Sequence, residues 1–268
     1  MKAIFATART FAPLLDTPHW KTVFGGNDGS SLPLNEKGLL KCIETVLFPK
    51  SCVLILEKKE AGIVRIKTQE YPYGDSLFID ERFLDFSDKN PSERKPKMPS
   101  EEHILNFLDE LAAKQTNYIW GGNRSAGIPE MIEYYPPRKS LESDVYAKWT
   151  FRGCDCSGMM HEATEGLTPR NTSSLVDYGN AIPVQNLSIQ GIVNILQPLD
   201  AIVWKGHVLF VFDQHTAIES RPDKGVVKSD LKNRLEEIKA QGFVPVDDWQ
   251  TTADKGNRFV VKRWHPLT

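Results

Sequence analysis

Cys156 and His207 have residue types and surroundings suited to nucleophilic catalysis. A cysteine attacks as the thiolate, whose formation is favoured by a helix N-terminus and a nearby histidine. Cys156 lies where a loop containing glycine and aspartate enters a short helix expected to end at Gly166. Free backbone N–H groups at that point would stabilise a thiolate and an oxyanion. His207 precedes the apolar run 208–212, and a rigid strand there would hold its ring as a general base.

The same two residues also have ordinary explanations. A cysteine near a helix start is usually a small buried residue, and a histidine at a strand start is usually structural or solvated. Spacing alone does not separate these readings. Cys154 is the other possible nucleophile, and we interpret it as a packing residue.

The cysteine count gives neither a disulfide scaffold nor a metal site. The chain has 268 residues and four cysteines, Cys42, Cys52, Cys154 and Cys156. The close pair would form a strained ring if bridged. With no Cys-x2-Cys pair and no histidine pair at ligand spacing, we expect no metal and no cofactor.

Composition excludes some function classes. Lys and Arg total 33 against 35 acidic residues, a formal net charge of −2, so the basic surface typical of nucleic-acid binding is missing. The sequence contains no run of 18 apolar residues, so we predict no membrane-spanning helix. The first 18 residues lack a clean apolar core and a small-residue cleavage site, so we predict no signal peptide.

The chain divides into two expected regions. In the first, β-branched runs at 52–56, 63–67 and 77–79 are separated by turns and suggest a small β-barrel. A polar, proline-containing stretch at 87–100 marks a boundary. Ser100 then caps a predicted amphipathic helix over 101–111.

The second region reads as helices followed by strands. Buried strands are expected at 201–204, 208–212, 216–219 and 259–264. Helices first and strands later predict an α+β domain, with helices packed on an antiparallel sheet.

Five short motifs between Tyr118 and about Gly225 occur in a characteristic order. They are Tyr118-Ile-Trp-Gly-Gly122, Asp155-Cys-Ser-Gly158, Pro169-Arg170, Leu196-Gln-Pro-Leu-Asp200 with Val203-Trp204, and Gly206-His-Val208. Together they resemble the NlpC/P60 family of papain-like cysteine peptidases. The resemblance implies that Cys156 is the nucleophile and His207 the general base.

The family's third polar residue, which orients the histidine, falls about a dozen positions later. Counting in this way reaches Glu219, where the family most often has histidine. A carboxylate can also accept the imidazole N–H and stabilise the imidazolium. His215 is the alternative, but its surroundings read as a hairpin tip.

The first region resembles a bacterial SH3 domain, through residues 44–50, 53–57, 63–67 and 71–74. This order of domains is that of the γ-D-glutamyl-L-diamino-acid endopeptidases. We therefore expect an SH3-like barrel over 1–90, a linker over 91–100 and an NlpC/P60 domain over 101–268.

The resemblance also implies a binding site between these domains. Tyr71 and Asp155 would grip the free amine of an L-Ala-γ-D-Glu-diamino acid peptide, with Tyr118, Trp120 and Ser157 also lining the site. A buried ammonium needs such a carboxylate partner.

Two departures from the family pattern stand out. The stretch 123–153 is longer than usual, and a loop of that length beside a site suggests a lid or selectivity element. Leu199 stands where glycine is usual, which concerns the local turn.

The sequence thus predicts a cysteine peptidase that cleaves the γ-D-glutamyl–diamino acid bond of murein stem peptides. The missing leader favours a cytoplasmic role in peptide recycling, since an exported wall hydrolase would need one. An acyltransferase or other amidase on the same fold is the enzymatic alternative. A wall-peptide-binding protein with a weakened site is the non-enzymatic one.

Overall fold

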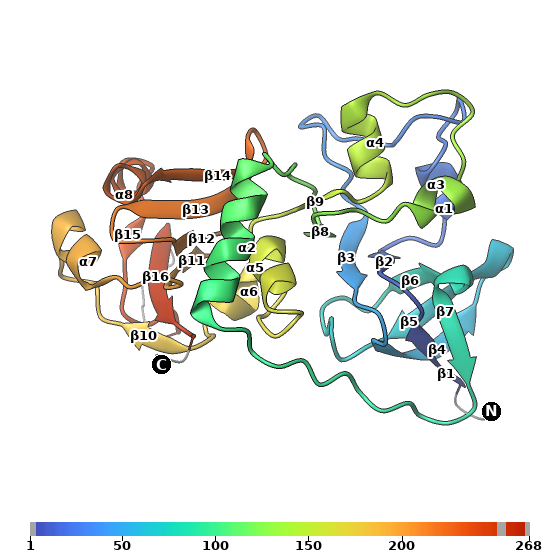
Figure 1. The fold of residues 1–268 in the computed structure, drawn as a ribbon, viewed down its shortest axis with the longest axis horizontal. Coiled ribbons are helices and arrows are strands. Elements are labelled where there is room, and N and C mark those ends of the chain that lie inside the picture. Colours follow the sequence, from blue (N-terminus) through green and yellow to red (C-terminus); the bar gives the residue numbers. More distant parts are fainter. Residues whose placement is uncertain (1–3, 251–255, 266–268) are drawn as a thin grey trace.

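A computed structural model describes residues 4–250 and 256–265, and it forms a mixed α and β molecule (Figure 1). A sheet near the N-terminus lies in one half, and a second sheet near the C-terminus lies in the other. Pairing is antiparallel in both, apart from β15 with β16. Within the described residues, no helix is long and apolar enough to cross a membrane.

The N-terminal sheet contains the strands predicted from the β-branched runs. Its strand order is β3-β2-β6-β5-β4-β1-β7. The strands are β1 (Ile4–Ala8), β2 (Ala12–Leu15), β3 (Ile43–Leu47), β4 (Cys52–Lys58), β5 (Ile63–Lys67), β6 (Leu77–Asp80) and β7 (Leu84–Ser87). Short helical turns accompany them at α1 (Trp20–Val23), η1 (Glu60–Gly62) and η2 (Glu81–Phe83).

The C-terminal sheet has the order β10-β16-β11-β12-β13-β14, with β15 beside β16. Its strands are β10 (Asn180–Ile182), β11 (Ala201–Trp204), β12 (His207–Val211), β13 (Thr216–Arg221), β14 (Gly225–Asp230), β15 (Val244–Pro245) and β16 (Arg258–Arg263). Strands β10, β14 and β15 were not predicted.

Helices cover both faces of this sheet, because apolar side chains point alternately to one face and to the other along each strand. Val203 and Val208 pack with α2 (Glu101–Ala113) and α5 (Gly158–Ala163). Leu209 packs on the opposite face with α7 (Ile189–Ile195) and α8 (Leu231–Ala240). The expected arrangement of helices on an antiparallel sheet is therefore present.

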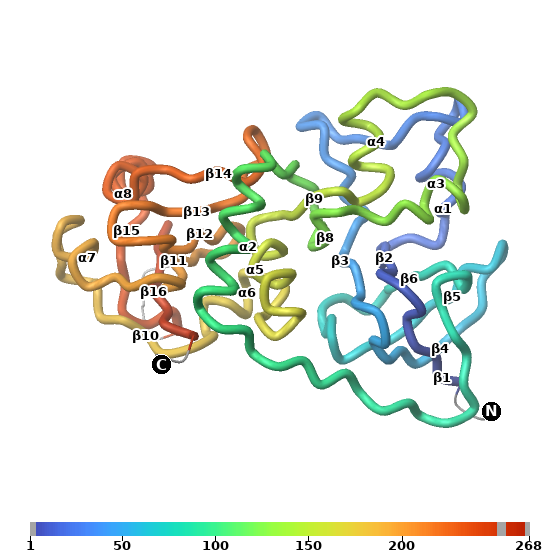
Figure 2. Tube along the Cα trace, viewed as in Figure 1, coloured from blue at the N-terminus to red at the C-terminus, as the bar shows by residue number. Residues whose placement is uncertain are grey.

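The chain passes from the first sheet to the second in an extended segment, residues 88–100, which runs along one side of the molecule (Figure 2). Ser100 then caps α2, as predicted, by accepting the backbone N–H of His103 at 3.2 Å. Arg94 fastens the segment by donating to Glu70 and to the carbonyl of Glu165.

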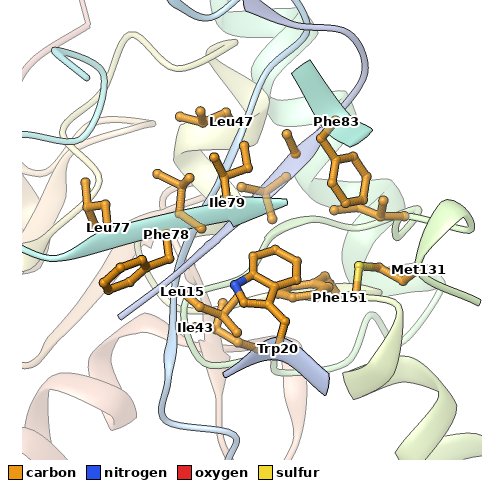
Figure 3. Close-up of a cluster of buried hydrophobic side chains, with 14 of the residues drawn as sticks. Leu15, Trp20, Ile43, Leu47, Leu77, Phe78, Ile79, Phe83, Met131 and Phe151 are labelled. Atoms are coloured by element: carbon orange, nitrogen blue, oxygen red, sulfur yellow. The ribbon is translucent and has the colours of Figure 1, made fainter. Parts of the chain in front are cut away.

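The long stretch 123–153 packs on the N-terminal sheet. It contains β8 (Asn123–Arg124), α3 (Glu130–Tyr134), α4 (Ser143–Trp149) and β9 (Gly153–Cys154). Met131, Trp149 and Phe151 are buried in the same hydrophobic cluster as Trp20 (Figure 3). This packing differs from the lid that its length suggested. The predicted division into 1–90, 91–100 and 101–268 stays a prediction.

Polar contacts reinforce this packing. The Tyr135 hydroxyl donates to the buried Asp80 carboxylate at 2.6 Å, and the Trp149 indole donates to the Tyr135 carbonyl at 3.0 Å. Asn123 makes strand-like hydrogen bonds with Val46 of β3 through both ends of its amide.

We expect Trp149→Ala to destabilise the protein by about 3–5 kcal/mol, because it empties a fully buried site and removes the indole donor. Urea unfolding followed by far-ultraviolet circular dichroism, which reports the backbone and not the tryptophan removed, measures the change in the free energy of unfolding. Tyr146→Ala is the matched control, since this aromatic of the same helix is 39% exposed, and its cost should stay within about 0.5 kcal/mol. Equal costs would show that 123–153 does not belong to the core.

Candidate active site

Cys156 lies in the turn between β9 and α5. The Asp155 side chain accepts the backbone N–H of Gly158 at 2.7 Å, and its carbonyl accepts that of Met159, so Asp155 satisfies donors of the first turn of α5. Among the described residues, nothing accepts the backbone N–H of Cys156. That donor is therefore available to an oxyanion forming at a carbon attacked by the thiolate.

His207 is the first residue of β12, and Glu219 lies on the neighbouring strand β13. Their side chains are in direct contact, with His207 Nε2 at 2.6 Å from Glu219 Oε2. This leaves Nδ1 as the ring nitrogen that Glu219 does not occupy. The carboxylate chosen by counting along the sequence thus lies where it can orient the imidazole.

Glu219 is fully buried, and Arg234 of α8 neutralises it. Arg234 donates from Nε to Oε1 at 2.6 Å and from Nη2 to Oε2 at 3.0 Å. Burial raises the pKa of Glu219, but the hydrogen bonds from His207 and Arg234 outweigh it and lower the pKa to about 2. Sequence reasoning missed Arg234, because its role appears only once Glu219 is known to be buried.

The environment of His207 favours the imidazolium. Burial lowers the pKa of His207, but hydrogen bonds with Cys156 and Glu219 outweigh burial and raise it to about 9. A protonated ring beside the thiol is the state that stabilises a thiolate. The geometry therefore supports a protonated His207 ring held in place by Glu219.

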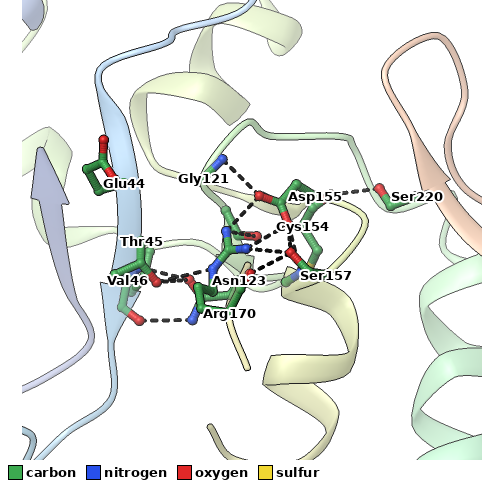
Figure 4. Close-up of polar contacts among 12 residues, drawn as sticks. Glu44, Thr45, Val46, Gly121, Asn123, Cys154, Asp155, Ser157, Arg170 and Ser220 are labelled. Carbon is green, nitrogen blue, oxygen red and sulfur yellow. Dashed lines mark hydrogen bonds and ion pairs between the residues drawn. The ribbon is translucent and has the colours of Figure 1, made fainter. Parts of the chain in front are cut away.

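Arg170 binds the loop that carries Cys156. Its Nη2 lies 2.7 Å from Asp155 Oδ2, and the Asp155 carboxylate also accepts the backbone N–H of Gly121 (Figure 4). Ser157 donates to the Arg170 carbonyl at 2.6 Å, and Arg170 Nε reaches Thr45 of β3. Asp155 is thus already neutralised, which argues against the expected role of Asp155 as the direct partner of a substrate amine.

Tyr71 approaches the same region from the N-terminal half. Its hydroxyl donates to Glu44 Oε2 at 2.5 Å. Burial, followed by this hydrogen bond, raises the pKa of Tyr71. No basic side chain of the described residues lies within ion-pair distance of Glu44, which was also missed from the sequence. Glu44, and not Asp155, offers the uncompensated carboxylate.

Tyr118 and Trp120 belong to the loop that precedes Gly121, whose N–H binds Asp155. Burial and then the charges of Asp155 and Cys156 raise the pKa of Tyr118. Trp120 is 38% exposed.

The alternative residues lie elsewhere. His215 is exposed in the turn between β12 and β13. Cys154 is fully buried, and its thiol donates to Glu162 at 3.1 Å. Burial and the Glu162 charge raise the pKa of Cys154 well above its usual value, as suits a packing residue.

Leu199 occupies the left-handed region, with φ 66°. This conformation favours glycine, which accounts for the glycine that the family pattern usually has at this position. Hydrogen bonds to Val211 and Trp264 hold the turn, so its geometry is kept with leucine.

No protein-family model and no curated protein matches the chain. Similar solved structures include NlpC2 from Trichomonas vaginalis, with 16% identity and a TM-score of 0.32 over 85% of this chain and 68% of that one. NlpC1 from the same organism gives 15% identity and a TM-score of 0.35 over 98% and 69%. Structural similarity at these TM-scores does not establish a family. Membership of the NlpC/P60 family therefore remains a prediction that rests on the motifs and the site.

We expect Glu219→Gln to lower kcat by roughly ten- to ten-thousandfold, the range for groups that orient a catalytic histidine. The amide keeps the shape of the side chain but removes the charge that faces His207 and Arg234. His215→Ala should leave kcat within about twofold, because His215 is exposed. The reverse ranking would assign the orienting role to His215.

The pH profile should also report this contact. The imidazolium of His207 is lost as pH rises through about 9, so kcat/KM should fall there. In Glu219→Gln this alkaline limb should move to lower pH, because one cause of the raised pKa is gone. An unmoved limb would mean that Glu219 does not act on the His207 proton. Steady-state rates between pH 5 and 10.5 provide the measurement.

Proposed function

We propose that this chain is a cysteine peptidase of the NlpC/P60 type that hydrolyses the amide between the γ-carboxyl of D-Glu and the diamino acid of murein stem peptides. The contact of His207 with a buried, ionised Glu219, beside Cys156, is the observation that carries the proposal. The motif order from Tyr118 to Val208 supports the family and a papain-like catalytic domain. The SH3-like resemblance of the residues before it, in that order of domains, supports the choice of bond.

The chemistry follows from the site. The Cys156 thiolate attacks the amide carbonyl, and the free N–H of Cys156 stabilises the oxyanion. His207 gives its proton to the leaving amine, and Glu219 stabilises the imidazolium until then. His207 next takes a proton from water, which attacks the thioester and releases the glutamyl product.

A free N-terminal amine is the recognition element that we propose for the N-terminal half, in the manner of an SH3-like domain. Glu44, held by the Tyr71 hydroxyl, supplies the carboxylate. Asp155 shapes the loop through Arg170 instead of binding the amine itself. Tyr118, Trp120 and Ser157 are proposed to line the remaining walls.

The test is hydrolysis of a purified L-Ala-γ-D-Glu-diamino acid tripeptide followed by mass spectrometry. Cys156→Ala should abolish release of the diamino acid, whereas Cys154→Ala, the matched control, should retain most of the activity. Iodoacetamide mapping should find Cys156 the most reactive thiol.

Activity in Cys156→Ala and its loss in Cys154→Ala would overturn the assignment of Cys156 as the nucleophile. Transfer of the glutamyl group to an added amine, without hydrolysis, would instead indicate an acyltransferase. An unreactive Cys156 with tight peptide binding would indicate a binding protein.

N-acetylation of the tripeptide should lower kcat/KM by roughly ten- to a hundredfold, because it removes the ammonium that Glu44 would bind. Glu44→Gln should remove most of this preference, and Glu36→Gln, an exposed acid on the loop before β3, should keep it. Equal rates on both peptides in the unaltered protein would show that the amine is not recognised.

A further inference from the structure

Lys41 lies at the rim of the proposed site without a carboxylate partner. It precedes β3 on an exposed segment, and its ammonium group lies over the ring of Trp120. Trp120 directly precedes Gly121, whose N–H binds Asp155. The ammonium therefore lies against the loop whose next residue, Gly121, binds the carboxylate directly before Cys156.

The charged residues around the site are mostly paired with one another, whereas Lys41, within the described ranges, is not. Asp155 is paired with Arg170, and Glu219 with Arg234. No acidic side chain among the described residues lies within ion-pair distance of Lys41. The Lys41 ammonium thus has no ion-pair partner among the described residues, and the same is true of the Glu44 carboxylate.

Lys41 is still close enough to the site for its charge to act there. Burial and then repulsion from Lys37 lower the pKa of Lys41. The charges of Asp155 and Glu44 oppose this shift, so both carboxylates are within electrostatic range. An aromatic face beneath an ammonium fixes its position without neutralising it.

We propose that Lys41, supported on Trp120, binds a carboxylate of the substrate peptide and makes the enzyme selective for the free acid over the amide. The inference rests on the proposed function and deepens it. In an L-Ala-γ-D-Glu peptide the cleaved carbonyl belongs to the side chain, so the α-carboxylate of D-Glu stays free. One peptide unit separates this carboxylate from the N-terminal ammonium. Lys41 and Glu44, three positions apart in the chain, present the complementary pair of charges.

The diamino acid supplies a second carboxylate of the same chemistry. Three tripeptides distinguish the sources: the free acid, the peptide with a D-Glu α-amide, and the peptide with a C-terminal amide. We expect the α-amide to reduce kcat/KM by roughly ten- to a hundredfold, mainly through KM, as for loss of a charge-assisted contact. A reduction with the C-terminal amide alone would assign Lys41 to the other carboxylate.

Three variants test the residue itself. Lys41→Met should lose the preference for the acid and react with acid and amide at similar rates. Lys41→Arg should keep the preference. Lys37→Met is the matched control, because it removes a lysine from the same exposed segment, and it should leave the preference intact.

Binding of the same peptides to Cys156→Ala, measured by calorimetry, separates this inference from the proposed reaction. Lys41-dependent preference for the acid without turnover by the unaltered enzyme would retain the subsite and overturn the peptidase. Turnover with the same acid preference in Lys41→Met would overturn the subsite and retain the peptidase. Absence of both binding and turnover would overturn both.

Discussion

The buried ion pair between Arg170 and Asp155 is the contact on which the site depends. It costs the desolvation of two charges, and it is stable because each group is fully hydrogen-bonded. Arg170 meets Asp155 and Ser157 on either side of Cys156, the carbonyl of Gly122, and Thr45 of the N-terminal sheet. The position of Cys156 is therefore defined by both halves of the molecule. A carboxylate that ties these parts together is poorly suited to take up a substrate charge.

Backbone packing around this ion pair is equally constrained. Gly121 has φ +69°, and a β-carbon there would lie 2.3 Å from the carbonyl oxygen of Ile43 on β3. The glycine lets the loop bearing Tyr118 and Trp120 approach the N-terminal sheet. Arg234 and Glu219 make a comparable buried pair behind His207. Charges needed for structure are thus neutralised inside the protein, while Glu44 and Lys41 remain open at the rim.

The sequence predicted those features that depend on local patterns. β-branched runs predicted β4, β5 and β6, and the apolar stripe after Ser100 predicted α2. Counting from His207 as the family resemblance implies selected Glu219, which does contact His207. Features that depend on distant contacts were missed. The partners of Asp155 and Glu219 are arginines that lie 15 residues further along the chain in each case, with no local signal of the pairing. Glu44 looked like any strand residue until the fold placed Tyr71 beside it. The barrel-like N-terminal fold and the roles of the site residues remain predictions.

The packing of 123–153 shows that the order of segments along the chain differs from their grouping into hydrophobic cores. After leaving the first sheet through the extended segment 88–100, the chain forms α2 and then returns to complete the first hydrophobic cluster with Trp149 and Phe151. Only afterwards does it build the second sheet. A single backbone cut within 88–100 would therefore leave both fragments incomplete, since the C-terminal piece would carry side chains that the N-terminal sheet needs. Such fragments would have to be recombined to rebuild the core, so the topology favours fragment complementation over dissection into independent domains.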